Sequence, residues 1–227
     1  MKTLIVAATY LEIKEILKIY NFEVINNEFY SFKKDSIEID ILISGIGIAF
    51  TVYYLTKKLA DKNYDLVINI GIAGSFNKNL NIGDVVFILE EQFADLGIEN
   101  KNDFETLFET GFISENKKPF INGKLINESI DDEIFKDFLK VKGITVNKVS
   151  GNANSVNNIQ KKFNSDIESM EGAAFFYVCL MEKVKFIQIR AVSNYVEERN
   201  KENWNIPLAI SNLTASVNSL LSRFNNI

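Results

Sequence analysis

The amino-acid sequence predicts a single α/β domain, and three observations support this fold class. Short apolar runs typical of buried strands alternate with segments that carry apolar residues at helical spacing. The chain has 227 residues, which is long enough for one large domain with a well-buried core. No linker, internal repeat or low-complexity tract interrupts it. We therefore expect one domain over residues 1–227.

The first half of the chain alternates strands and helices. Residues 3–8 are continuously apolar, as in a buried strand, and the next segment has its apolar side chains on one helical face. We expect strands at residues 3–8, 22–32, 37–43, 66–70 and 85–89, and helices at residues 10–20 and 49–60.

The second half is less regular. We expect strands at residues 144–149 and 186–192, helices at residues 134–139 and 207–224, and a polar loop at residues 150–156. Residues 100–133 are polar and irregular, with scattered phenylalanines. Loops of this length commonly cover a binding site or form an interface, and we expect one of these two roles here.

The rest of the chain is interpreted around residues 165–181, which contain the main candidate for a functional site. Their sequence is S-D-I-E-S-M-E-G-A-A-F-F-Y-V-C-L-M. The pattern predicts the end of a strand, an acidic turn with Glu168 and Glu171, and an apolar helix that begins at Gly172. Ligands of open α/β sheets bind at the carboxyl ends of strands, so the turn is a candidate active-site floor. A helix-capping role for Glu171 accounts for the local pattern equally well.

Glu12 is a second acidic candidate, in the first turn of the helix after the first strand. The helix dipole favours an ionised carboxylate there, which suits a base acting on water; a solvated first-turn acid is the alternative. Further along, Gly71 and Gly74 follow a buried strand. They either let a ligand approach the backbone or form a tight turn that needs positive φ.

The composition excludes several kinds of chemistry. The chain has no histidine, so Ser-His-Asp and Cys-His mechanisms and the usual histidine zinc sites are excluded. The single cysteine, Cys179, cannot form an internal disulfide, which is consistent with a reducing compartment. We expect neither a metal nor a cofactor, and catalysis by carboxylates, amides, hydroxyls or a lysine.

Charge and hydropathy bear on location and partners. The net charge of -5 offers nucleic acid no electrostatic attraction. The apolar part of the amino terminus is too short for a signal peptide, and no stretch approaches a membrane span. We expect a cytoplasmic protein that binds neither nucleic acid nor membrane.

A G-x-G sequence at Gly45 and Gly47 raises the possibility of a dinucleotide-binding fold. The third glycine position is occupied by Phe50, and the acidic residue Asp65 precedes the next strand instead of following it. Both observations exclude that interpretation.

Seven motifs resemble, in order, those of the nucleoside phosphorylase/nucleosidase family, most closely its methylthioadenosine/S-adenosylhomocysteine nucleosidase branch. They are the glutamate after the first strand at Glu12, S-G-I-G at Ser44, N-x-G-x-A-G at Asn69, G-D-V-V at Gly83, S-G-N-A at Ser150, M-E-G-A-A at Met170 and I-R-A-V-S-N at Ile189. The resemblance covers nearly the whole chain. Within that branch, E-S-M-E-G-A-A-F-F, S-N-Y-V-E-x-R-N and N-W-x-I-P-L-A-I resemble the futalosine hydrolases of menaquinone biosynthesis.

The resemblance implies a fold, an assembly and roles for individual residues. The fold would be a three-layer α/β/α domain around a mixed, partly closed sheet, in a homo-oligomer, with a dimer favoured. Glu12 would activate the attacking water, and Glu171 with Met170 would grip the ribose of a nucleoside. The other substrate-binding positions would be Gly45, Ile46, Gly74, Ser75, Asn154, Ser169 and Arg190, of which Arg190 would support the site.

Asn194 departs from the methylthioadenosine nucleosidase pattern, which has an aspartate at this position. A 6-oxopurine has acceptors at O6 and N7, to which an amide NH₂ can donate and a carboxylate cannot. The resemblance and Asn194 together predict cleavage of futalosine to release hypoxanthine. The alternatives are a methylthioadenosine/S-adenosylhomocysteine nucleosidase, another purine nucleoside hydrolase or phosphorylase, and a non-catalytic nucleoside-binding protein.

Two further features bear on the substrate. Near the first strand only Thr9 could contact phosphate, and the neighbouring Glu12 would repel it, so water is the expected nucleophile. Futalosine carries a benzoate, and Arg199 is our candidate to bind its carboxylate as a bidentate pair. A surface ion pair of Arg199 with Glu197 or Glu198 is the alternative.

Overall fold

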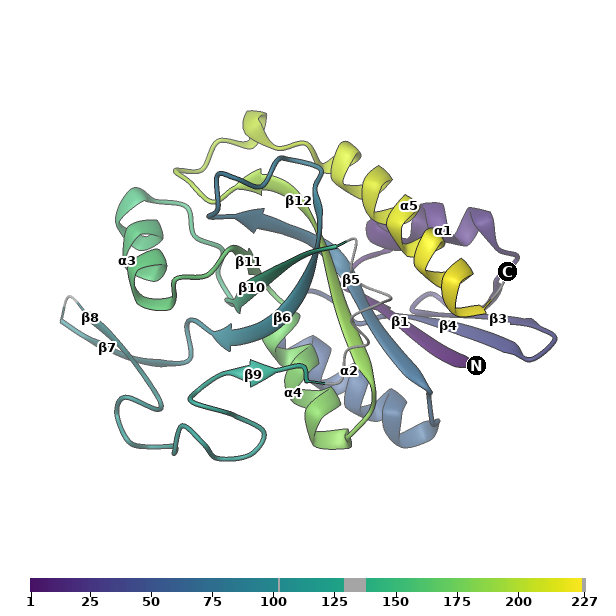
Figure 1. The fold of residues 1–227 in the computed structure, drawn as a ribbon, viewed down its shortest axis with the longest axis horizontal. Helices are drawn as coiled ribbons and strands as arrows, with labels where there is room; N and C mark the ends of the chain where they lie inside the picture. The colour runs from purple at the N-terminus through teal and green to yellow at the C-terminus, as the bar shows by residue number, and fades with distance from the viewer. Residues whose placement is uncertain (102, 129–137, 226–227) are drawn as a thin grey trace.

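A mixed β-sheet with helices on both faces forms the core of the computed structural model, which describes residues 1–101, 103–128 and 138–225 (Figure 1). The strands are β1 (Lys2–Ala7), β2 (Glu23–Asn26), β3 (Phe29–Lys34), β4 (Ile37–Ile43), β5 (Leu66–Ser75), β6 (Val85–Phe93), β7 (Gly97–Asn100), β8 (Asp103–Thr106), β9 (Leu125–Ile126), β10 (Leu139–Thr145), β11 (Ile167–Ser169) and β12 (Phe186–Tyr195). The helices are α1 (Tyr10–Ile19), α2 (Ile48–Asp61), α3 (Ala153–Phe163), α4 (Gly172–Glu182) and α5 (Ile206–Asn225), with a 3₁₀ turn, η1, at Lys201–Asn203.

The sheet is mixed and partly closed, as predicted. Its order is β11-β10-β6-β12-β5-β1-β4-β3-β2, and β11 pairs back with β5, so that β5, β12, β6, β10 and β11 form a closed ring. The β5–β12 pair is parallel, whereas β12–β6 and β11–β5 are antiparallel. The carboxyl ends of β5 and β12 therefore lie side by side, where ligands of α/β sheets bind.

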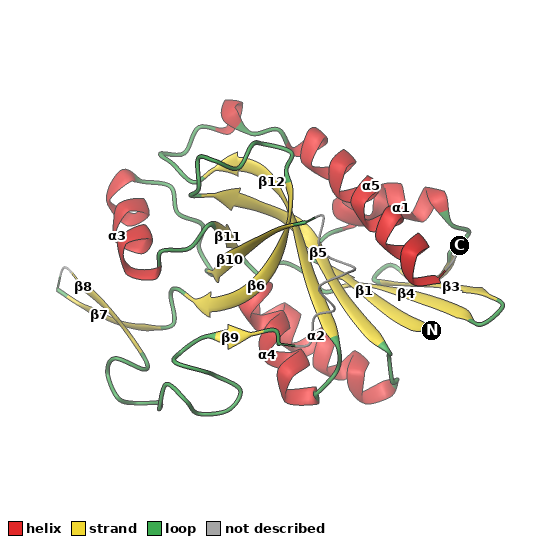
Figure 2. Cartoon of the chain, viewed as in Figure 1, coloured by secondary structure: helices red, strands yellow, loops and turns green. Residues whose placement is uncertain are grey.

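Helices cover both faces of the sheet (Figure 2), and a hydrophobic layer lies between the sheet and the helices on each face. Side chains alternate in β1: Leu4 and Val6 pack in the layer shared with α2 and α4, and Ile5 and Ala7 in the layer shared with α1 and α5. Full burial of one such aliphatic side chain contributes about 1.5–3 kcal/mol. The observed architecture is the predicted three-layer α/β/α arrangement.

The apolar helix after the acidic turn begins at Gly172, as predicted. It is buried around most of its circumference, including Phe175, Phe176 and the single cysteine, Cys179. Burial raises the pKa of the Cys179 thiol well above its usual value, so this side chain packs in the core as an uncharged thiol.

Other predicted elements need correction. Residues 22–32 form two strands, β2 and β3, that pair as a hairpin. The strand predicted at residues 144–149 is instead β10, five residues earlier, because Val141 is buried between exposed Lys140 and Lys142 in the two-residue period of a strand. The helix predicted at residues 134–139 lies outside the described residues as far as residue 137, and Leu139 begins β10.

Two further corrections affect the site. The predicted loop at residues 150–156 gives way to α3 at Ala153, because the side chain of Asn152 caps this helix by accepting a hydrogen bond from Ser155 N (2.9 Å). The strand predicted to end at Ile70 continues to Ser75 as β5. Residues 100–133 are not wholly irregular, since β8 and β9 lie within them, and Phe120 packs on Tyr177 of α4.

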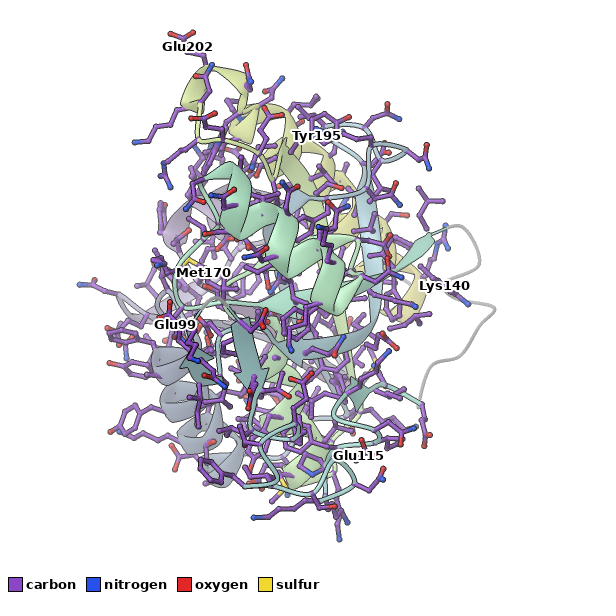
Figure 3. The ribbon with its side chains drawn as sticks, turned by 90° about the vertical axis from the view of Figure 1, so that its left-hand side faces the viewer. Glu99, Glu115, Lys140, Met170, Tyr195 and Glu202 are labelled. Carbon is purple, nitrogen blue, oxygen red and sulfur yellow. The ribbon has the colours of Figure 1, made fainter. Side chains whose placement is uncertain are left out.

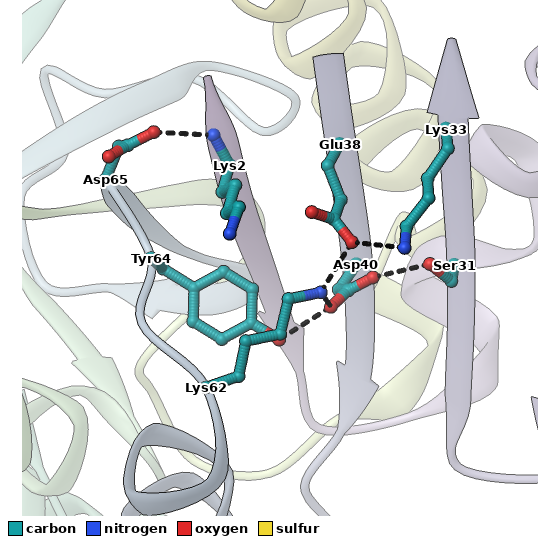
Figure 4. A network of polar contacts seen from close by, with 8 residues as sticks. All are labelled: Lys2, Ser31, Lys33, Glu38, Asp40, Lys62, Tyr64 and Asp65. Atoms are coloured by element: carbon teal, nitrogen blue, oxygen red, sulfur yellow. Dashed lines mark hydrogen bonds and ion pairs between the residues drawn. The ribbon is translucent and has the colours of Figure 1, made fainter. Parts of the chain in front are cut away.

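A buried polar cluster fastens α2 to the β3–β4 side of the sheet (Figure 4). The Asp40 carboxylate is fully buried and accepts hydrogen bonds from Lys62 Nζ (2.6 Å), Tyr64 OH (2.6 Å) and Ser31 Oγ (2.7 Å). Lys62 also donates to Glu38. Because every buried charge here has a partner, the cluster is accounted for by the fold.

Among the described residues, no helix combines the length and the apolar character needed to cross a lipid bilayer.

Candidate active site

Glu12 lies in the first turn of α1 with its side chain turned into the protein, 7% exposed. Its Oε2 accepts hydrogen bonds from Thr9 N (2.9 Å) and Thr9 Oγ1 (3.2 Å), and its Oε1 accepts one from Ile72 N on β5 (3.3 Å). It therefore forms a capping box with Thr9, but it is not a solvated surface acid.

Glu171 occupies the N-cap position of α4, 8% exposed. Its side chain makes no capping hydrogen bond to α4. Instead its Oε1 accepts a hydrogen bond from Gly47 N (3.0 Å), in the S-G-I-G loop. Both Gly45 and Gly47 in this loop have positive φ, which favours glycine. The capping alternative thus does not account for the Glu171 carboxylate.

Arg190, on β12, is the buried cation near these two acids and is 1% exposed. It donates to Asn69 Oδ1 (2.5 Å) and to its neighbour's carbonyl, Ile189 O (3.1 Å). Burial raises the pKa of both Glu12 and Glu171, and the Arg190 charge opposes that rise at each carboxyl. Repulsion from Glu171 raises the pKa of Glu12 further.

Two glycines of β5 leave room for functional side chains. A Cβ on Gly71 would lie 2.8 Å from Glu12 Oε1, and a Cβ on Gly74 would lie 3.2 Å from Asn194 Nδ2 and 2.8 Å from Val196 Cγ2. Neither glycine has positive φ, so the tight turn considered from the sequence is wrong. Both positions are instead places of close approach.

A pocket opens beside Asn194, and we call it the Asn194 pocket. Its lining residues are Gly74, Val149, Ser150, Glu168, Asn194, Tyr195, Val196, Glu197, Glu198, Arg199, Asn200 and Trp204. Glu168 is 5% exposed, and its two oxygens accept hydrogen bonds from Ser150 N (2.9 Å) and Ser150 Oγ (2.6 Å). Burial raises the pKa of Glu168, and these two bonds oppose the rise.

Asn194 is held by its sequence neighbours. Its Oδ1 accepts from Ser193 Oγ (2.7 Å), and its Nδ2 donates to Tyr195 O (2.9 Å). An amide NH₂ has two hydrogens, so one donor remains for a ligand in the pocket.

Arg199 lies in the same pocket, with its guanidinium 5.4 Å from the centre of the Trp204 ring. Within the described part of the chain, no ion pair joins it to Glu197 or Glu198, the alternative raised by the sequence. Glu197 interacts instead with Lys78 and Asn203.

The structure places Glu12 and Glu171 around Arg190, which lies close to Gly71 of β5. Asn194 lies further along β12, against Gly74. Figure 3 looks toward the side of the molecule that carries α3 and labels Met170 and Tyr195, the sequence neighbours of Glu171 and Asn194. The last residue of β11, Ser169, is buried and its Oγ accepts from Gly172 N (3.3 Å).

Among the candidate residues, Gly74, Asn194 and Arg199 line the Asn194 pocket, whereas Glu12, Glu171 and Arg190 are not part of its lining. Three further candidates lie elsewhere. The hydroxyl of Ser75 donates to the carbonyls of Asn77 (2.9 Å) and Asp166 (3.2 Å). Asn154 is exposed in the first turn of α3, and Ile46 is 54% exposed before α2. Their contact with substrate remains a prediction.

Sequence reasoning assigned no role to Glu91, on β6, although it is fully buried close to Arg190. It also gave Glu168 no specific function. The only signal in the sequence was an acidic pair, Glu90 and Glu91, directly after an apolar run.

Comparison with known proteins identifies the family. Residues 2–223 match the family model described as Phosphorylase superfamily. The chain belongs to this superfamily. Among its relatives, the futalosine hydrolase of Thermus thermophilus is 29% identical, with 80% of each chain covered. The 5'-methylthioadenosine/S-adenosylhomocysteine nucleosidase of Buchnera aphidicola is also 29% identical, covering 100% of this chain and 98% of the relative.

A solved structure of the superfamily has the same fold. The nucleosidase of Neisseria meningitidis, in complex with methylthio-immucillin-A, superposes with a TM-score of 0.82 at 22% identity, covering 98% of this chain and 100% of that one. Relatives named for two different substrates are equally similar in sequence, so identity does not choose between the substrates. The side chains of the pocket are a more direct guide.

Proposed function

We propose that this protein is a purine nucleosidase that hydrolyses the N-glycosidic bond of futalosine and releases hypoxanthine. The observation that carries the proposal is the pair of groups in the Asn194 pocket. Glu168 offers a hydrogen-bond acceptor there, and Asn194 offers a donor.

Hypoxanthine and adenine present opposite patterns to such a pair. Hypoxanthine has a donor at N1–H and acceptors at O6 and N7, whereas adenine has an acceptor at N1 and a donor at its 6-amino group. A carboxylate at Glu168 suits N1–H, and the free N–H of Asn194 suits O6 or N7. A mismatched, unpaired polar group in such a pocket costs about 1–3 kcal/mol, so the pair favours the 6-oxopurine.

The two buried glutamates supply the other parts of a hydrolytic site. Cleavage of the N-glycosidic bond passes through an oxocarbenium-like sugar, which water attacks at C1′ on the face opposite the base. Glu12 accepts the proton of that water, and burial raises its pKa towards the range in which a general base works well. Glu171 accepts hydrogen bonds from the ribose hydroxyls.

The electron pair of the broken bond leaves with the base. Asn194 cannot donate a proton as an acid, so hypoxanthine departs as an anion that the amide N–H stabilises, and solvent then protonates it. Hypoxanthine is a more acidic purine than adenine, which makes departure as an anion easier.

Water is favoured over phosphate as the nucleophile by the charge near α1. The acids Glu12 and Glu171 are both buried there, and the charge of the nearby cation, Arg190, is already shared among Glu12, Glu171 and Glu91. A phosphate dianion would therefore meet more negative than positive charge and would be repelled.

We also propose that the protein works as a homodimer. Phe50 and Tyr53 are 56% and 59% exposed, and their spacing puts them on one face of α2. Ile46, just before the helix, is 54% exposed. The same segment contains Gly47, which holds Glu171, so a partner seated on this face would adjoin the site. Sedimentation equilibrium tests this, and replacing Phe50 with Glu should produce a monomer.

The test of function is to incubate the protein with futalosine, inosine or methylthioadenosine, with and without phosphate, and to identify the released base. We expect hypoxanthine from futalosine at a rate independent of phosphate. Release of adenine from methylthioadenosine alone would instead identify a methylthioadenosine nucleosidase. Phosphate dependence would identify a phosphorylase, and no release from any of the three would indicate a binding protein.

A further inference from the structure

Glu91 is a fully buried acid on β6 that the reaction outlined above does not use. Its Oε1 accepts a hydrogen bond from Gln188 Nε2 (2.6 Å), and its Oε2 accepts one from Thr145 Oγ1 (2.9 Å). The same Thr145 hydroxyl oxygen accepts from Ala173 N (2.7 Å), in the first turn of α4. A hydrogen-bonded chain thus runs from Glu91 through Thr145 to α4, the helix whose N-cap is Glu171.

The start of α4 also lies directly against Glu91. A Cβ on Gly172 would collide with Glu91 Oε1 and would lie 2.6 Å from its Cδ. A Cβ on Gly143, on the neighbouring strand, would lie 2.8 Å from the same Cδ. Both glycines leave space for this one carboxyl, so its position and that of the first turn of α4 are fixed together.

Arg190 links Glu91 electrostatically to the reacting end of the site. Its charge acts on Glu91, Glu171 and Glu12, and the charge on Glu171 acts on Glu91. The uncharged groups facing Glu91 are Thr145 of β10 and Gln188 of β12. Burial raises the pKa of Glu91 to about 7 despite those partners. When Glu91 is uncharged, one fewer carboxylate competes for Arg190.

We propose that Glu91 is a positioning residue for the nucleosidase reaction, which fixes the first turn of α4 through Thr145 and so orients Glu171 against the ribose. This inference rests on the proposed function, because it takes Glu171 as the ribose-binding carboxylate. Glu91 touches no substrate itself, and its effect passes through the backbone of Ala173.

The variants Thr145→Val and Glu91→Ala break the chain at two points, and Thr145→Ser and Glu91→Gln are the matched conservative controls. Serine keeps the hydroxyl. Glutamine keeps the shape, its carbonyl can accept from Thr145, and its NH₂ can donate to Gln188 Oε1, a buried acceptor that has no partner among the described residues. Circular dichroism and thermal unfolding check that each variant is folded.

The decisive measurement is kcat/KM for futalosine and for its 2′-deoxy analogue. We expect Thr145→Val and Glu91→Ala to lose roughly 10²-fold on futalosine, the size of effect that a displacement of about 1 Å can cause. On the deoxy analogue we expect a clearly smaller loss, because one of the hydroxyls that donate to Glu171 is already missing. The two conservative variants should keep the preference for the ribose substrate.

Several results would overturn the proposal. Equal losses of kcat/KM on both substrates would mean that Glu91 and Thr145 serve only the stability of the fold. Unchanged kcat/KM in all variants would mean that they position nothing. In both cases the unmutated protein still cleaves futalosine, so the proposed function stands. If the unmutated protein releases no base from any nucleoside, the proposed function fails first, and with it the role of Glu171.

Discussion

The carboxylate of Glu12 lies directly over Gly71, so that a Cβ at position 71 would stand 2.8 Å from Glu12 Oε1. We predict that Gly71→Ala lowers kcat/KM roughly 10²-fold by displacing the base. The free energy of unfolding should change by no more than about 1 kcal/mol, because Gly71 has an ordinary strand conformation and the atom it would meet ends a flexible side chain. Urea unfolding and steady-state kinetics measure the two effects.

Gly151→Ala is the matched control for this substitution. The added Cβ would lie 3.5 Å from Arg199 Cβ, which is an ordinary van der Waals distance, and Gly151 does not have positive φ. This variant should keep normal kinetics. A Gly71→Ala protein that is as active as the control would show that the Glu12 carboxylate need not occupy its observed position.

Replacing Glu12 by Gln keeps the shape of the side chain but removes the base. We predict that turnover falls by about 10²–10⁴-fold, the usual range for loss of a general base, while substrate binding changes little. Burial and Glu171 raise the pKa of Glu12, so activity of the unmutated protein should fall on acidification while the pH is still above 4.5, the ordinary value. The pH profile of kcat measures this, and undiminished turnover in Glu12→Gln would remove Glu12 from the mechanism.

Base choice should depend on the two polar groups of the Asn194 pocket. We predict that Asn194→Asp lowers kcat/KM for futalosine and raises it for methylthioadenosine, because a carboxylate accepts from a 6-amino group and repels O6. Glu168→Gln should weaken hypoxanthine binding by about 1–3 kcal/mol, the cost of an unsatisfied buried polar group. Steady-state kinetics with the two nucleosides measure the first effect, and calorimetric titration with hypoxanthine measures the second. Unchanged base preference in both variants would place the purine elsewhere.

Many of the helices and strands could be predicted from the spacing of apolar residues, because that spacing is regular within them. The helix at Gly172–Glu182 is apolar throughout and was predicted with its correct start. The strand predicted at residues 85–89 actually continues to Phe93, because Glu91 is buried and bonded instead of ending the strand. Its partners Gln188 and Thr145 are 97 and 54 positions away. No local pattern can identify partners at such separations.

The same reason limits what the sequence says about the site. Glu12 and Glu171 were candidates because each stands where a strand leads into a helix, and the structure places them around Arg190. The pairing of Glu168 with Asn194 in one pocket was not predictable, because it depends on how β11 and β12 lie relative to each other. The loop predicted at residues 150–156 includes Asn154, which lies in α3 because Asn152 caps that helix. A cap of this kind does not show in the apolar periodicity.

Arg199 is the candidate for the benzoate of futalosine, and it lies beside Trp204 in the pocket that contains Asn194. We predict that Arg199→Ala weakens binding of futalosine more than that of inosine, by about 1.5–3 kcal/mol, the value of a charge-assisted hydrogen bond. Arg199→Lys, which keeps the charge but not the bidentate geometry, should lose less. Calorimetry with both nucleosides measures the difference. Equal losses would assign Arg199 to the purine end of the substrate.

The stability of the protein should depend on the charge of Glu91. Burial raises the pKa of Glu91 from 4.5 to about 7, so the folded state favours the protonated carboxyl. The stability of the fold is therefore highest with respect to this group below pH 4.5, and it is lost as the pH rises from 4.5 through about 7. Over that range the free energy of unfolding of the unmutated protein should fall by up to about 3 kcal/mol, since one pKa unit corresponds to about 1.4 kcal/mol. The Glu91→Gln protein should not show this fall. Urea unfolding of both proteins between about pH 4.5 and pH 8 measures the difference in unfolding free energy, in which the contributions of Glu12, Glu168 and Glu171 largely cancel. A difference that stays constant with pH would mean that Glu91 does not titrate in this range, and that its charge has no part in sharing Arg190 with Glu171.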